Sequence, residues 1–217
     1  MIGLVLFGLG CGPKGAPPVP EPASSPEQAL FAEITVAYAR GDAAGALSGV
    51  HRMESLFPES RAFTVLGDWQ TSLDRMGKAA PPLDSLGWQG PSGTLADHPA
   101  TLLVFFEPWC PHCQEDVPRV EQLRREYEPR GLGVIGVTAL SHGSTAEALA
   151  EFVAAGELGF PIGVEDGSVS EAYGVAGVPH LVFVREGLVV WAGHPSLLTL
   201  DLVGAIADGA PLPIPMP

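Results

Sequence analysis

The chain has 217 residues, with 11 Lys and Arg against 25 Asp and Glu, which gives a formal charge of −14. Nucleic-acid binding requires clustered basic side chains, so this acidic balance argues against a nucleic-acid partner. Its 3 cysteines are too few for a disulfide-stabilised scaffold, whereas 46% hydrophobic residues suffice for a buried core.

The first residues predict a processed and lipid-anchored N-terminus. Residues 2–9 are apolar but shorter than the roughly 20 residues that cross a bilayer, and they lead into Gly10-Cys11. Small residues before a cysteine resemble the bacterial lipobox, which implies signal cleavage and lipidation of Cys11. The proline-rich residues 12–25 would then tether the protein on the oxidising, extracytoplasmic side of a membrane. The alternative is an incidental cysteine within an ordinary signal peptide.

Residues 26–78 predict a small helical segment. Ser25 and Gln28 have the spacing of a capping box around Pro26, which begins a helix that Gly41 ends. Two more helices are expected at about residues 43–57 and 60–76. The pattern resembles a single tetratricopeptide hairpin, and two interpretations stay open: a helical cap packed on the main domain, or a groove that docks a partner peptide.

From residue 81 onward, short apolar runs alternate with helical patterns, which indicates an α/β fold. Strands are predicted at residues 101–106, 132–137 and 161–164, and as a hairpin at 181–184 and 188–191. Helices are predicted after residue 113, from a capping box at Ser144 and Glu147 to about residue 155, and at 168–173 and 200–207. The proline-rich residues 209–217 predict a tail.

The sequence Trp109-Cys110-Pro111-His112-Cys113 lies between the buried strand at 101–106 and the next helix. Two cysteines three positions apart in the first turn of a helix can close a disulfide, and the free N–H groups there stabilise a thiolate. We expect Cys110 to attack, Cys113 to resolve the mixed disulfide, and His112 to favour the Cys110 thiolate further. The cofactor would be the redox-active disulfide itself.

Other uses of this cysteine pair are less favoured. Zinc would need distant ligands such as His142 or His180, so no metal is expected. Covalent haem attachment needs a histidine where Gln114 stands. A structural disulfide would cross-link very little chain, and the Pro-x-x-x-Thr/Ser-x-x-Cys pattern of a peroxidase is missing around both cysteines.

Residues 81–208 resemble the thioredoxin fold, a three-layer α/β/α sandwich, and within it the TlpA/ResA-like thiol–disulfide oxidoreductases, which carry an extra strand and helix. The resemblance implies that Pro179 is cis and faces the cysteines, and that the backbone of Val178 binds a client peptide. Trp109 would border that client site, and His180, directly after Pro179, either borders it too or is an ordinary residue at a strand edge.

Two further residues follow from the same resemblance. Asp116 stands where this group has a buried Glu near the resolving thiol, so it could carry the proton of Cys113; the other interpretation is an acid that favours the helix dipole. The Pro111-His112 dipeptide resembles that of DsbA-like oxidases, which implies a reduction potential above that of thioredoxin.

These observations predict an extracytoplasmic thiol–disulfide oxidoreductase whose partners are client proteins with thiols or disulfides and a redox partner protein. The alternative is a membrane-tethered adaptor that binds partners through residues 26–78 and has a redox-passive thioredoxin fold.

Overall fold

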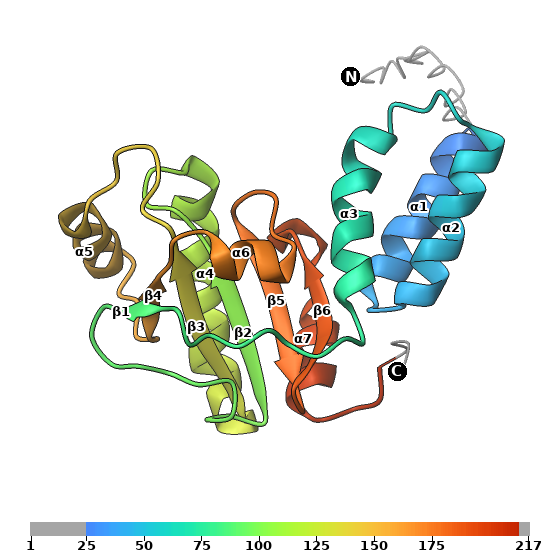
Figure 1. The fold of residues 1–217 in the computed structure, drawn as a ribbon. Coiled ribbons are helices and arrows are strands. Elements are labelled where there is room, and N and C mark those ends of the chain that lie inside the picture. The colour runs from blue at the N-terminus through green and yellow to red at the C-terminus, as the bar shows by residue number, and fades with distance from the viewer. Residues whose placement is uncertain (1–24, 213–217) are drawn as a thin grey trace, which may run out of the picture.

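The structure is a computed structural model, and it describes residues 25–212. The predicted signal region, nearly all of the predicted tether and the predicted lipidation site Cys11 lie outside the described residues, as do residues 213–217 of the predicted tail. No helix within residues 25–212 is both long and apolar enough to cross a membrane. Figure 1 shows a central sheet with helices packed on it and a group of three helices at one end.

The sheet has six strands in the order β1-β4-β3-β2-β5-β6. The pairs β2–β3 and β3–β4 are parallel, and the pairs β1–β4, β2–β5 and β5–β6 are antiparallel. The strand bounds are Gly87–Trp88 (β1), Ala100–Phe105 (β2), Leu132–Thr138 (β3), Ile162–Val164 (β4), His180–Arg185 (β5) and Leu188–Gly193 (β6). Every residue of β2 and β3 is buried, as the continuous apolar runs in the sequence predict.

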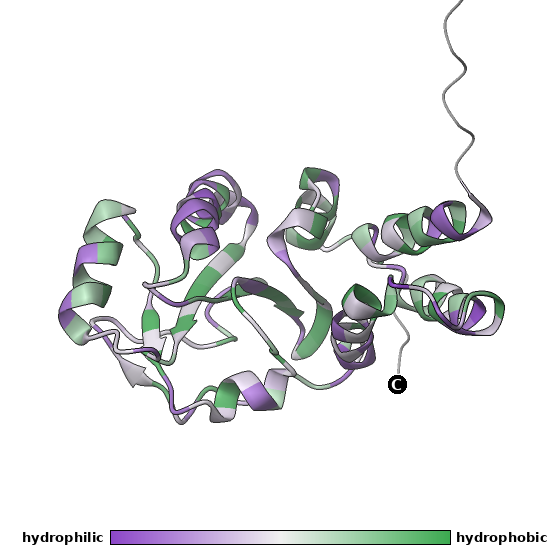
Figure 2. Ribbon diagram, turned by 90° about the horizontal axis from the view of Figure 1, so that it is seen from above, coloured by the Kyte–Doolittle hydropathy of each residue, from purple (hydrophilic) through white to green (hydrophobic). Residues whose placement is uncertain are grey.

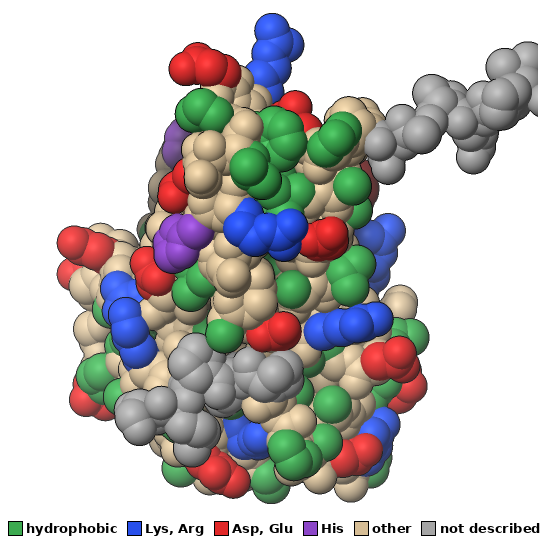
Figure 3. Space-filling view, turned by 90° about the vertical axis from the view of Figure 1, so that its right-hand side faces the viewer, with side chains coloured by type: hydrophobic (Ala, Val, Ile, Leu, Met, Phe, Trp, Pro, Cys, Tyr) green, Lys and Arg blue, Asp and Glu red, His purple; other side chains and the backbone are tan. Residues whose placement is uncertain are grey.

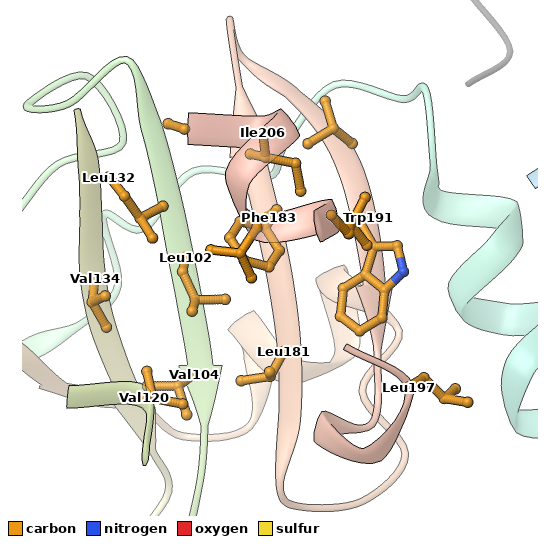
Figure 4. Packing of buried hydrophobic residues seen from close by; sticks show 14 of the residues in the cluster. Leu102, Val104, Val120, Leu132, Val134, Leu181, Phe183, Trp191, Leu197 and Ile206 are labelled. Atoms are coloured by element: carbon orange, nitrogen blue, oxygen red, sulfur yellow. The ribbon is translucent and has the colours of Figure 1, made fainter. Parts of the chain in front are cut away.

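Helices cover both faces of the sheet, with α4 and α7 on one face and α6 on the other (Figure 2). On the first face Leu102 and Phe183 share a core with Ile206 of α7 (Figure 4), and on the second Phe105 contacts Tyr173 of α6. The predicted three-layer α/β/α sandwich is therefore confirmed. The helix bounds are Pro26–Ala39 (α1), Ala43–Leu56 (α2), Phe63–Arg75 (α3), Pro111–Tyr127 (α4), Ala146–Ala155 (α5), Ser168–Tyr173 (α6) and Leu200–Ala207 (α7), with short 3₁₀ turns at Glu128–Arg130 and Pro195–Leu197.

The helices α1 to α3 lie at the β6 end of the sheet, and α3 stands next to this edge strand (Figure 1). The hydroxyl of Tyr38 in α1 donates to the carbonyl oxygen of Ala192 at 2.6 Å, and Nε1 of Trp191 donates to the carbonyl oxygen of Tyr38 at 3.2 Å. After α3 the chain runs along β6, where the N–H of Gly77 donates to Val189 and the N–H of Val189 donates to Lys78. These bonds fasten the helical segment to the sheet.

The helical segment also shares its interior with the main domain. Tyr38, Leu73 and Met76 belong to the same buried cluster as the sheet and α4, while Ile34 and Met53 form a smaller cluster between the helices. This continuity favours the interpretation of a helical cap over that of a separate docking module. On the outer face of the segment, hydrophobic, acidic and basic side chains are interspersed (Figure 3).

Most elements begin and end within a few residues of the predicted bounds, but three differ. The helix α5 is capped by Thr145, whose hydroxyl accepts from the N–H of Ala148, so the capping box predicted from Ser144 is wrong by one residue. The helix α3 begins at Phe63 because Ser60 accepts from the N–H of Ala62 in a preceding turn. The strand β1 is not predicted, since only two residues form it.

Candidate functional site

The site is built where β2 ends and α4 begins. Cys110 is the N-cap residue of α4, in extended conformation, and Pro111 occupies the first helical position, where its missing N–H costs no hydrogen bond. The N–H of Cys110 donates to the carbonyl oxygen of Glu107 at 3.1 Å, and the carbonyl oxygen of Cys110 accepts from the N–H of Gln114 at 3.1 Å. Cys110 therefore lies at the positive end of the helix.

The two cysteines are free thiols that differ in their surroundings. Cys110 is 5% exposed and Cys113, inside the first turn of α4, is 0% exposed. Burial raises the pKa of the Cys113 thiol well above its ordinary value, the backbone of Glu107 opposes this, and the neighbouring Cys110 and Asp116 add to the increase. Cys113 is thus held as a neutral thiol, which suits a group that reacts second.

The loop before β5 lies against Cys110. The Val178–Pro179 peptide bond is cis, as the family resemblance implies, and Pro179 is buried. The Sγ of Cys110 donates to the carbonyl oxygen of Val178 across 3.6 Å. The structure therefore brings Cys110, Cys113, Val178 and Pro179 to one place, although these residues come from distant parts of the chain.

Trp109 stands beside the pair and is 43% exposed. Its Nε1 donates to Oγ of Ser141 at 3.2 Å, and its ring lies 4.4 Å from that of His142. The buried carboxylate of Glu107 accepts from the N–H of Ser141 at 3.1 Å. Glu107, Ser141 and His142 have no place in the site predicted from the sequence; the signal available was an acidic residue directly after an apolar strand.

The histidines near the site lie in contrasting surroundings. His112 is exposed on the first turn of α4. Burial, with a smaller contribution from the charge of His194, lowers the pKa of His180 to about 4, and Nε2 of His180 is buried without a hydrogen-bond partner. Burial likewise lowers the pKa of His194, which the sequence placed only in a turn, against the opposing charge of Asp116. His180 is therefore neutral at physiological pH.

Asp116 lies near the pair but is held by another residue. Its Oδ1 accepts from Arg119 at 2.8 Å, so the expected exchange of a proton with Cys113 has no direct hydrogen bond in this structure. Among residues 25–212, no group of three or more His, Cys, Asp or Glu side chains could hold a metal ion.

A known protein family matches the part of the chain that contains this site. The family model described as AhpC/TSA matches residues 76–192, from the end of the helical segment to β6. The chain belongs to the AhpC/TSA family. Since this match spans β2, α4 and the loop before β5, the AhpC/TSA region contains both cysteines and Pro179. The predicted thioredoxin-like family is confirmed.

Relatives of this AhpC/TSA-family chain carry redox names. It is 30% identical to the thiol-disulfide oxidoreductase ResA of Halalkalibacterium halodurans over 103 residues, which are 47% of this chain and 57% of that protein. It is 28% identical to ResA of Bacillus thuringiensis subsp. konkukian over 134 residues, 59% and 76% of the two chains. A putative thiol:disulfide interchange protein DsbE from Chlorobium tepidum, 23% identical, superposes with a TM-score of 0.54 over 62% of this chain and 98% of its own, which shows the shared fold.

Proposed function

We propose that this protein is an extracytoplasmic thiol–disulfide oxidoreductase that exchanges disulfides with protein cysteines through Cys110 and Cys113. The observation that carries the proposal is the 3.6 Å contact between Cys110 Sγ and the carbonyl oxygen of Val178. It sets the reactive sulfur beside a backbone segment that can pair with an extended client. The ResA relatives named as thiol-disulfide oxidoreductases support the same activity.

The chemistry needs only the two thiols and a client. In the reducing direction, the Cys110 thiolate attacks a client disulfide, one client sulfur leaves as a thiolate, and a mixed disulfide forms. Cys113 then loses its proton and attacks the Cys110 sulfur, so that the second client thiolate leaves and the Cys110–Cys113 disulfide closes. Two electrons pass to the client, and the reverse steps oxidise a client dithiol. We assign the Cys113 proton to Asp116, whose charge already acts on that thiol.

Trapping tests this activity directly. In the full chain, Cys113→Ser should accumulate mixed disulfides with oxidised insulin, because the resolving attack is missing, whereas the matched variant Cys110→Ser should form none. The wild-type protein should reduce insulin with dithiothreitol as electron source. A folded Cys113→Ser protein that traps nothing, together with a wild type that leaves insulin intact, would overturn the proposal.

The extracytoplasmic location rests on the lipobox-like sequence that ends at Cys11. A lipid on Cys11 would anchor the protein to a membrane, with residues 12–25 as a tether to the redox domain. Labelling of cells with radioactive palmitate should mark the wild type and not a Cys11→Ala variant. Equal labelling of both, or of neither, contradicts the anchor without touching the redox chemistry.

A further inference from the structure

A pocket of about 410 Å³ lies between the helical segment and the loops at the Cys110 end of β5 and β6. One wall comes from the loop that contains Val178 and Pro179, continuing to His180. The opposite wall comes from α3, which stands next to β6 (Figure 1). Val178, which lines the pocket, also contacts Cys110 Sγ through its carbonyl oxygen, so the pocket lies next to the reactive sulfur.

The wall from α3 is one face of that helix. Val65, Asp68, Trp69 and Ser72 line the pocket, and their spacing of three and four residues places them on a single side. Val65 is 43% exposed although it is a large apolar side chain, and the half-buried ring of Trp69 lies 5.1 Å from that of Tyr38 on the pocket floor. This wall therefore offers apolar and aromatic surface.

The charged side chain that lines the pocket is acidic, although Arg75 of α3 lies beside the lining residue Gly174. Of the described residues that line it, Asp68 is the carboxylate and none is Lys or Arg. His180 lines it as a neutral imidazole with a buried and unpartnered Nε2. The formal charge of the whole chain, −14, adds an attraction for basic molecules at longer range.

We propose that this pocket, with α3 as its outer wall, binds the stretch of client polypeptide next to the client's reactive cysteine and selects stretches that carry Lys or Arg. The proposal rests on the function proposed above and names its client class. The extended client pairs with the backbone at Val178. Its basic side chain lays its aliphatic stem on Trp69 and Val65 and brings its charge to Asp68.

The test uses the full reduced protein and peptides that carry one cysteine as a mixed disulfide with glutathione, with either Lys or Glu at the neighbouring positions. The wild type should react faster with the Lys peptide than with the Glu peptide. Asp68→Lys should abolish or invert that preference, a change of about fivefold or more, since an exposed attractive pair becomes a repulsive one. Asp74→Lys, on the exposed face of the same helix, should leave the preference largely intact.

A second pair of variants tests the apolar wall. Val65→Asn removes apolar surface without adding charge and should slow reaction with both peptides, whereas Leu56→Asn, 60% exposed on α2 and not among the residues that line the pocket, should not. The rate with the small neutral disulfide of 2-mercaptoethanol should be the same in all these proteins. Equal rates for the Lys and Glu peptides in the wild type, or equal effects of Asp68→Lys and Asp74→Lys, overturn the pocket proposal. Failure to react with the small disulfide at all overturns instead the proposed redox function.

Discussion

The carbonyl oxygen of Val178 accepts a hydrogen bond from the thiol of Cys110 across 3.6 Å, and this contact joins the start of α4 to the loop before β5. In the proposed exchange, a client would pair with the backbone of Val178 while its sulfur meets Cys110. The proposed nucleophile and the proposed client-binding backbone are therefore in direct contact.

The unequal surroundings of the cysteines predict unequal reactivity. In the reduced native protein, iodoacetamide should modify Cys110 much faster than Cys113, which is buried and whose pKa is raised. Mass spectrometry of partly modified protein measures this directly. Denatured protein, in which the two thiols should react alike, is the control, and faster labelling of Cys113 in the native state contradicts the assigned roles.

The Pro111-His112 dipeptide predicts the reduction potential. Because this dipeptide resembles that of DsbA-like oxidases, the reduction potential should lie above the about −270 mV of thioredoxin. Replacement His112→Ala should lower it by some tens of millivolts. Equilibration with glutathione buffers measures both proteins. A wild-type value at or below about −270 mV would show this prediction to be wrong.

His180 should make the free energy of unfolding depend on pH. Its pKa is about 4 in the folded protein against an ordinary 6.5, so between these values the unfolded chain binds a proton that the folded chain does not. The contribution to the free energy of unfolding is full above pH 6.5 and is lost as the pH falls toward 4, by at most about 1.4 kcal/mol per pH unit. When urea unfolding is measured from pH 4.5 to 7.5, the free energy of unfolding should depend less steeply on pH for His180→Gln than for the wild type. His51→Gln, at an exposed position of α2, should keep the wild-type slope.

Glu107 predicts the stability of the loop beside Trp109. Truncation by Glu107→Ala leaves the N–H of Ser141 without its acceptor and should cost about 1–3 kcal/mol in the free energy of unfolding. Replacement Glu107→Gln retains an acceptor and should cost less. Glu115→Ala, at an exposed position of α4, serves as control and should change little. Similar losses for all three variants would contradict a specific contact.

The hydrogen bond from Tyr38 should contribute to the stability of the contact between the helical segment and the sheet. The variant Tyr38→Phe loses the hydroxyl that donates to Ala192 and should lower the free energy of unfolding by about 1–3 kcal/mol. Deletion of residues 26–76 uncovers the main core and should yield a chain without a cooperative unfolding transition. A deleted protein that unfolds as sharply as the full chain would show that the segment is an independent module.

The sequence predicts those features that have a local signal. The buried run of β2, the capping box at Ser25 and the bounds of α7 follow from short patterns, and Pro179 follows from the family resemblance. Contacts between distant residues leave no such pattern, so the carboxylate of Glu107 on Ser141 and the hydroxyl of Tyr38 on Ala192 emerge only in the folded chain. The same holds for the pocket wall on α3, since its residues read in sequence as an ordinary amphipathic face.

The course of residues 77–80 along β6 has a consequence for the behaviour of the protein at high concentration. An exposed edge strand is a template on which other chains can add and aggregate. Here the backbone of Gly77 and Lys78 occupies hydrogen-bonding positions of Val189, and the opposite edge consists of the two residues of β1. Within the described residues, both borders of the sheet are thus protected against self-association.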